Sequence, residues 1–137
     1  MSQEEVIQQK YLEFQALEQE IKLLQQHLMN LSQQLLELKR LRQDLEELKK
    51  AKIASKVFSP LGAGIYVETE LKNNSQLLIN SGANVLTSKT VEEAQEIVTQ
   101  RINEMTKLFD QMEQSLSLQI GSHATLSEEL KGLLEQK

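Results

Sequence analysis

The sequence has no cysteine and no tryptophan, a single proline, and only two tyrosines and three phenylalanines. Without cysteine there can be no disulfides and no thiol chemistry, which fits a reducing compartment. No apolar run approaches the ~20 residues that a membrane span requires. The opening residues, Met1 to Glu5, are polar and acidic where a secretory signal would be basic and apolar. We therefore expect a cytoplasmic protein.

Charge and length narrow the possible functions further. Twenty acidic and fifteen basic residues leave a net charge of −5, which disfavours nucleic acid as the main partner. Charge is also uneven, because residues 1–20 carry five acids and one base whereas residues 39–56 carry seven bases and three acids. This could steer partners toward the acidic end, or it could be an ordinary solvated exterior. The 137 residues suit one domain with a modest core.

Residues that could perform catalysis do not cluster. The two histidines, His27 and His123, each lack a second histidine or cysteine at metal-ligand spacing. Consecutive carboxylates such as Glu46 and Glu47 diverge on a helix, so they cannot converge as an acid/base pair. Gly62-Ala63-Gly64 lacks the lysine and the helix start of a phosphate-binding loop. The sequence therefore predicts no enzyme, no cofactor and no metal site.

A heptad stripe dominates the first fifty residues. Its spacing alternates between three and four, with Lys10 as the one polar member. Beyond it a strict repeat would reach Arg42, but Leu41, Leu45 and Leu48 continue the stripe in a register shifted by one residue. The pattern predicts a helix to about Ala54. Its apolar seam is Ile7, Phe14, Leu17, Ile21, Leu24, Leu28, Leu31, Leu35 and Leu38.

A second helical stripe begins at a capping box formed by Thr90 and Glu93. Gln119 and His123 interrupt this stripe where apolar residues are expected, and Gly121 lies between them. An interior glycine costs a helix about 1 kcal/mol relative to alanine, so we expect looser final turns. The apolar members are Val91, Ala94, Val98, Ile102, Met105, Phe109, Met112, Leu116, Leu126, Leu130 and Leu133.

The segment between the helices has the pattern of two β-hairpins. Val57–Leu61 reads as a strand whose Pro60 must lie at an edge or a bulge. Residues 65–71 alternate apolar and polar side chains, as in a strand with one buried and one solvated face. Turn residues separate this strand from 77–79 and from 85–87. Four short strands have unpaired edges and little apolar surface, so they should pair with strands of other subunits.

Antiparallel pairing of the helices would bring both termini together at the end opposite the hairpins. More apolar side chains gather there than a two-helix seam can cover, so an open groove could bind another protein. They could equally be ordinary seam and flank residues. The residues concerned are Val6, Ile7, Tyr11, Phe14, Ile120, Leu126, Leu130, Leu133 and Leu134.

The central segment strongly resembles that of prefoldin α subunits. The resemblance is carried by residues 59–71 (SPLGAGIYVETEL), 77–85 (LLINSGANV) and 89–94 (KTVEEA). Room for two hairpins matches the α type, since β-type subunits of that family have one. Asn84 departs from the glycine frequent there, but asparagine tolerates the left-handed conformation.

The resemblance implies a mainly α fold with a small β insert. A long antiparallel coiled-coil hairpin would have two β-hairpins at its base that assemble into an intersubunit β-barrel. Residues 1–137 would be one prefoldin-like domain, made of a helix (1–55), the assembly hairpins (56–89) and a second helix (90–137). Residues holding the barrel would be Ile65, Val67, Leu71, Leu78, Ile79 and Val85.

The function implied is that of an ATP-independent chaperone. Two α-type and four β-type chains would form a hexamer that captures unfolded client proteins between its coiled-coil tips. Clients would pass to a group II chaperonin, and the nine apolar residues near the termini would be the client contacts. The alternative is a structural coiled-coil adapter in a prefoldin-like complex, whose tips bind one folded partner.

Overall fold

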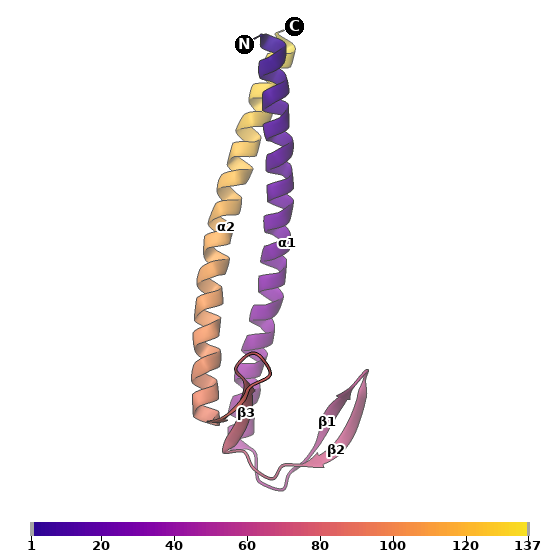
Figure 1. The fold of residues 1–137 in the computed structure, drawn as a ribbon, viewed down its shortest axis with the longest axis vertical. Helices are drawn as coiled ribbons and strands as arrows, with labels where there is room; N and C mark the ends of the chain where they lie inside the picture. Colours follow the sequence, from indigo (N-terminus) through magenta and orange to yellow (C-terminus); the bar gives the residue numbers. More distant parts are fainter. Residues whose placement is uncertain (1, 137) are drawn as a thin grey trace. The chain divides into compact units, whose positions relative to one another are not determined.

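A computed structural model describes residues 2–136 and shows two long helices separated by two β-hairpins (Figure 1). This confirms the predicted fold class. The elements in chain order are α1 (Gln3–Lys50), β1 (Lys56–Gly62), β2 (Ile65–Glu70), β3 (Gln76–Asn80), β4 (Leu86–Thr90) and α2 (Val91–Glu135).

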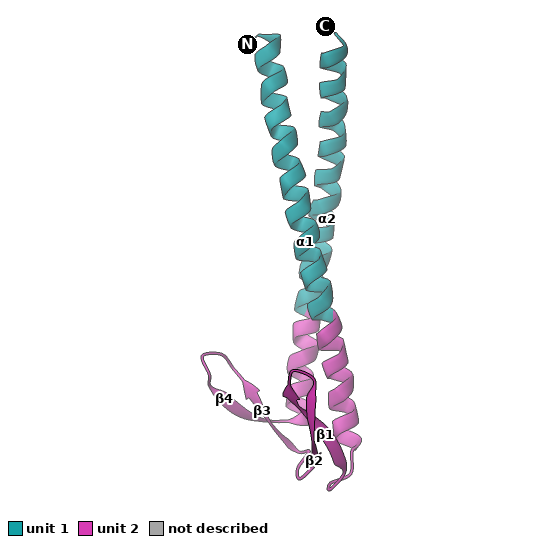
Figure 2. Cartoon of the chain, turned by 90° about the vertical axis from the view of Figure 1, so that its right-hand side faces the viewer, with its two compact units in different colours: residues 1–35, 104–137 teal, residues 36–103 magenta. Residues whose placement is uncertain are grey.

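The chain divides into two compact units, and each helix contributes to both of them (Figure 2). Unit 1 comprises residues 1–35 and 104–137, and unit 2 comprises residues 36–103. Unit 1 therefore holds only helix, including both ends of the chain, whereas unit 2 holds both hairpins and the helix ends that flank them.

In unit 1 the two helices run antiparallel. Lys10 pairs with Glu129 and Glu18 lies beside His123, so residue numbers rise along α1 as they fall along α2. The heptad positions of α1 from Ile7 to Leu35 are half-buried or buried. The α2 stripe is likewise covered through the polar positions Gln119 and His123, and the helix continues unbroken past them. These positions form the seam that the spacing predicts.

Unit 2 contains the most completely buried side chains. Val91, Ala94, Val98 and Ile102 lie on one α2 stripe and are at most 5% exposed, and Leu45 of α1 is buried with them. Arg42 is exposed whereas Leu45 is buried and Leu48 half-buried, as expected from the shifted register. Small and β-branched side chains thus form the tightest part of the helix pair.

Polar contacts flank this core. The Thr90 hydroxyl accepts from the Glu93 backbone N–H (3.1 Å) and lies 3.2 Å from the Glu93 carboxylate, which confirms the capping box. The Gln95 side-chain amide donates to Glu46 (2.7 Å) and holds the pKa of that carboxyl below its ordinary value. Burial acts against this lowering of the Glu46 pKa, and the nearby charges of Lys50 and Lys49 add to the lowering.

Each hairpin is a separate two-stranded antiparallel sheet. In the first, Val57 pairs with Thr69 and Ser59 with Val67, and the register shifts between Pro60 and Gly62. The proline therefore lies at a β-bulge, one of the two positions predicted for it. In the second hairpin the pairing runs from Gln76 opposite Thr90 to Asn80 opposite Leu86.

In each hairpin turn a glycine with positive φ, Gly62 (128°) or Gly82 (106°), precedes two central residues that also have positive φ. These are Ala63 (51°) with Gly64 (80°), and Ala83 (50°) with Asn84 (61°). Such pairs match the right-handed twist of the flanking strands. Asn84 adopts the left-handed conformation, so the turn forms with asparagine at this position, as predicted.

Several element boundaries differ from the predicted ones, and backbone hydrogen bonds explain two of these differences. Helix α1 ends at Lys50 rather than near Ala54, because Ala54 and Ser55 instead exchange backbone hydrogen bonds with Leu71 (2.7 and 2.9 Å). The last strand begins at Leu86 rather than Val85, whose N–H closes the turn on the Gly82 carbonyl (3.0 Å). Backbone hydrogen bonds decide both limits, to a distant residue at the end of α1 and within the turn before β4, and side-chain periodicity does not report them.

Asn74 caps the end of α1 from a distance in sequence. Its side-chain amide donates to the carbonyls of Leu48 (3.1 Å) and Ala51 (3.0 Å), and the Leu48 carbonyl also accepts from the Ala51 N–H (3.2 Å). Asn74→Ala should therefore lower the free energy of unfolding by about 1 kcal/mol or more, measured by chemical denaturation at fixed protein concentration. Lys72→Ala, a solvent-exposed change in the same loop, is the control. Equal stability of the two variants would contradict this capping role.

Candidate functional site

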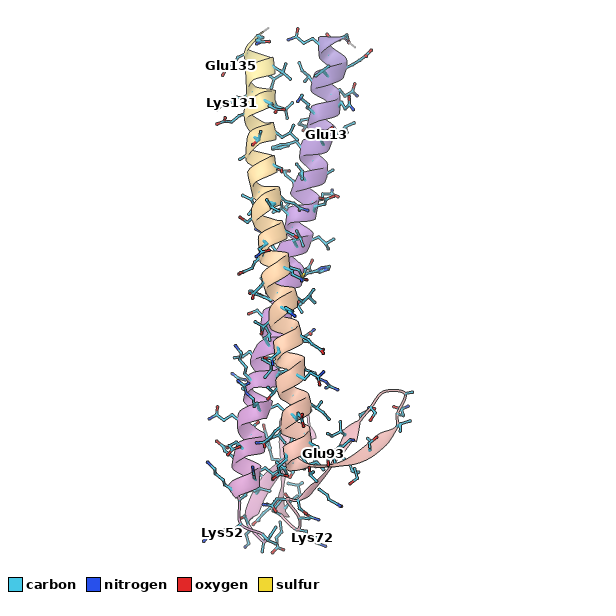
Figure 3. All side chains as sticks on the ribbon, turned by 90° about the vertical axis from the view of Figure 1, so that its left-hand side faces the viewer. Glu13, Lys52, Lys72, Glu93, Lys131 and Glu135 are labelled. Atoms are coloured by element: carbon cyan, nitrogen blue, oxygen red, sulfur yellow. The ribbon has the colours of Figure 1, made fainter. Side chains whose placement is uncertain are left out.

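Two surfaces carry the candidate functional residues. The first is the tip segment, defined as residues 2–20 and 117–136 of unit 1, where Glu13, Lys131 and Glu135 mark the two helices (Figure 3). The second consists of the exposed faces of the two hairpins in unit 2. Each is built from side chains that the helical or β periodicity directs away from the helix seam.

The seam within the tip segment contains polar groups. Lys10, the polar member of the α1 stripe, forms an ion pair with Glu129. His123 stacks on Phe14 with ring centroids 4.2 Å apart and an interplanar angle of 25°. Its Nε2 lies 3.4 Å from a Glu18 oxygen, within ion-pair range but outside hydrogen-bond geometry. Among the described residues that nitrogen and Gln119 Oε1 are buried without a hydrogen-bond partner, so this stretch is packed less favourably than a leucine seam.

The nine residues predicted to contact clients occupy different environments. Leu126 and Leu130 are buried at 7% and 8% exposure, so their apolar surface is already covered by the seam. Val6, Ile7, Phe14 and Leu133 are half-buried along it. Tyr11, Ile120 and Leu134 point away from the seam and are 52%, 47% and 57% exposed. In this arrangement only the last three present a wholly accessible apolar surface.

Two exposed apolar residues of the tip segment were missed by sequence reasoning. Leu12 and Leu118 are 58% and 74% exposed, and both lie outside the heptad stripes. Heptad spacing identifies only seam residues, so it does not point to these two leucines. An apolar side chain outside the stripe is nevertheless a signal of an exposed patch.

A groove runs along one side of the tip segment, with a volume of about 580 Å³. Helix α1 contributes Glu13 and Leu17, and the rest comes from α2. The α2 residues are Ser117, Leu118, Gly121, Ser122, Thr125, Leu126 and Glu129. The groove therefore has apolar walls, small polar side chains and a carboxylate on each helix.

The β1–β2 hairpin exposes apolar side chains on both faces. Paired residues share a face, so Val57, Ser59, Val67 and Thr69 lie together, and Ser59 and Thr69 are joined by a hydroxyl hydrogen bond of 2.7 Å. The other face carries Phe58, Pro60 and Tyr66, with Lys56 and Glu68 forming a solvent-exposed ion pair at 3.8 Å. The single solvated face expected for residues 65–71 is thus not seen, since nothing covers either side of the isolated hairpin.

The β3–β4 hairpin has one face toward its own helices and one toward solvent. Leu77 and Ile79 are half-buried and line an apolar groove of about 440 Å³ with Leu45 and Val98. Leu78 and Leu86 are on the other face and are strongly exposed. Because successive side chains of a strand point to opposite faces, Leu78 and Ile79 lie on different faces of the hairpin, although the sequence predicted both as assembly residues.

The residues predicted to hold an assembly are mostly accessible. Ile65, Val67, Leu78 and Val85 are exposed, whereas Leu71 and Ile79 are half-buried. Sequence reasoning missed five further exposed apolar residues of the hairpins, which are Val57, Phe58, Leu61, Tyr66 and Leu86.

A family model described as prefoldin subunit matches residues 17–136. The chain belongs to the prefoldin subunit family. It is 38% identical over 76 residues to prefoldin subunit alpha of Methanosarcina acetivorans, a match covering 53% of this chain and 54% of that protein. A second α subunit, from Archaeoglobus fulgidus, is 27% identical over 130 residues and 95% of both chains. The matches to the Methanosarcina relatives span about half the length of those proteins.

Structural comparison shows the same fold. Filamentous prefoldin from Methanocaldococcus jannaschii superposes with a TM-score of 0.70 at 19% identity, covering 90% of this chain and 97% of that one. In the prefoldin fold the barrel forms between subunits, so separate open hairpins are expected of a single chain. Within residues 2–136 no helix is long and apolar enough to cross a membrane, and the described acidic and histidine side chains form no three-ligand metal cluster.

The buried amide at Gln119 gives a direct test of seam packing. Gln119→Leu should raise the free energy of unfolding by about 1 kcal/mol, because it removes a buried oxygen without a partner and adds apolar contact. Thermal or chemical denaturation at constant protein concentration would measure the change. Gln114→Leu, at an exposed position of the same helix, is the control. A loss of stability in Gln119→Leu would mean that the amide is satisfied in solution.

Proposed function

We propose that this chain is an α-type prefoldin subunit that holds unfolded proteins without ATP and passes them to a group II chaperonin. The observation that carries the proposal is the set of large apolar side chains exposed in the tip segment beside a covered seam. That set is Tyr11, Leu12, Leu118, Ile120 and Leu134. A soluble helix pair with no partner would more commonly place charged or polar residues at such positions.

Weak contacts of this kind suit a holdase. Each exposed side chain offers roughly 1.5–3 kcal/mol if a client buries it fully, and far less in partial contact. Several subunits acting on one client would multiply these contacts into useful avidity, while each contact stays easy to release. Such a mechanism requires no nucleotide, because dissociation of individual contacts is already fast.

Assembly through the hairpins would bring several tip segments together. Each hairpin is only two-stranded, so its outer edges keep unpaired backbone groups, and both hairpins expose apolar side chains. We propose that these edges join those of other subunits in a barrel with two α-type and four β-type chains. Ile65, Val67 and Leu78 would lie in that interface together with Phe58, Tyr66 and Leu86. The whole of residues 1–137 would then act as one prefoldin-like domain in the cytoplasm.

The tip contacts can be tested with three exposed residues. Tyr11→Ser, Ile120→Ser and Leu134→Ser combined should reduce suppression of client aggregation several-fold, because they remove accessible apolar area without opening the seam. Light scattering of two unrelated denatured proteins, diluted into the assembled complex, measures the effect. Met29→Ser with Leu108→Ser is the matched control, since both are exposed helix positions outside the tip segment.

Equal suppression by the tip and control variants would exclude the tip segment as the client surface. A chain that suppresses no aggregation, but binds one folded protein tightly, would instead support the adapter function.

Assembly depends on the face of β2 that carries Val67. Val67→Asp should leave helix content unchanged by circular dichroism but abolish the oligomer in native mass spectrometry, because it places a carboxylate in an apolar interface. Glu70→Ala, on the opposite face of the same strand, should assemble normally. An intact oligomer with Val67→Asp would place the interface elsewhere.

A further inference from the structure

We propose that the tip groove between Glu13 and Glu129 selects client segments that carry a basic side chain beside apolar ones. This rests on the proposed holdase function and specifies the chemical class of client that this subunit prefers. The groove, its open floor and the sign of its charge each support the proposal.

The groove has room for a side chain from another molecule. Leu17 and Leu126 supply apolar contact at its base, and the α2 wall consists of small side chains. At Gly121 an added Cβ would meet no atom within 4 Å, so this wall is open rather than filled by neighbouring residues. A volume of about 580 Å³ accommodates more than one aliphatic side chain.

Charge determines which segments would enter. Glu13 has no ion-pair or hydrogen-bond partner among residues 2–136, whereas the charge of Glu129 is paired with that of Lys10. Residues 1–20 carry five acids and one base, and residues 117–137 carry three acids and two bases. A lysine or arginine beside an apolar residue would therefore gain attraction at the rim, whereas a glutamate would be repelled.

The same charge disfavours other occupants. A second copy of this tip segment would bring equally acidic helices together, and the phosphates of a nucleic acid would meet the same repulsion. The basic-apolar segment of an unfolded protein is the occupant that satisfies both the apolar base and the acidic rim.

A steric test uses the two glycines of α2. Gly121→Met should fill the groove and weaken binding of a labelled leucine–lysine peptide about tenfold, the loss of one well-packed contact. Gly132→Met is the matched control, because that glycine is also helical and exposed with open space around its Cβ, but it lies outside the groove. Both changes strengthen the helix similarly, so fluorescence anisotropy with the full chain in its assembly separates occupancy from helix stability.

A charge test uses two glutamates of α1. The lysine peptide should bind several-fold more tightly than a leucine–glutamate peptide of the same length, and rising salt should shrink that difference. Glu13→Lys should abolish the preference, while Glu20→Lys, an exposed change of equal charge outside the groove, should keep most of it.

Failure of the inferred client preference can be distinguished from failure of the proposed holdase function. Equal affinity for the two peptides, or unchanged binding after Gly121→Met, would overturn the inference even if the complex still suppresses aggregation. A change in native mass on Gly121→Met would assign the groove to a second subunit and also overturn it. Failure to suppress the aggregation of any denatured protein would overturn the proposed function itself.

Discussion

The apolar seam between α1 and α2 is the contact on which the other features of this prefoldin subunit depend. Among the described apolar side chains that are buried, Leu45, Val91, Ala94, Val98 and Ile102 belong to unit 2. The seam is therefore most complete close to the hairpins. That concentration supports the β3–β4 hairpin, whose Leu77 and Ile79 line a groove with Leu45 and Val98, because an isolated two-stranded ribbon is only marginally stable.

Strands usually bury their apolar side chains in a core, but these two hairpins leave most of theirs exposed. They expose large apolar side chains and free edges, which in a monomer would invite aggregation. Their turns, with Ala63 and Ala83 at positive φ, keep the strands in a fixed register in spite of the backbone cost. Such preorganised strands lose little conformational entropy when they join other subunits, which favours assembly over misassembly.

The tip segment differs from the helix pair of unit 2 in the composition of its seam and of its outer surface. Polar groups at Lys10, Gln119 and His123 interrupt its seam, and apolar residues such as Leu118 lie on its exterior. Its apolar side chains thus lie both between the helices, as at Leu126 and Leu130, and on their outer surface. In the proposed client groove, the unpaired charge of Glu13 would add a long-range selection that apolar contact alone cannot provide.

The sequence by itself determined the features that depend on local spacing. Heptad periodicity from Ile7 to Leu35 predicted the seam, Thr90 and Glu93 predicted the start of α2, and the glycine and asparagine turns predicted the hairpins. Resemblance in residues 59–94 predicted the prefoldin family, which the family model and the fold confirm. These features could be predicted because each arises from residues a few positions apart.

Only the tertiary structure decided which residues far apart in the sequence contact one another, and how deeply each is buried. Leu126 and Leu133 both belong to the α2 stripe, yet Leu126 is buried in the seam and Leu133 is only half-buried. Likewise, Asn74 ends α1 by bonding Leu48, and Phe14 stacks on His123 more than a hundred positions away. Burial and capping of this kind depend on which surfaces the fold brings together, and side-chain periodicity within one helix does not contain that information.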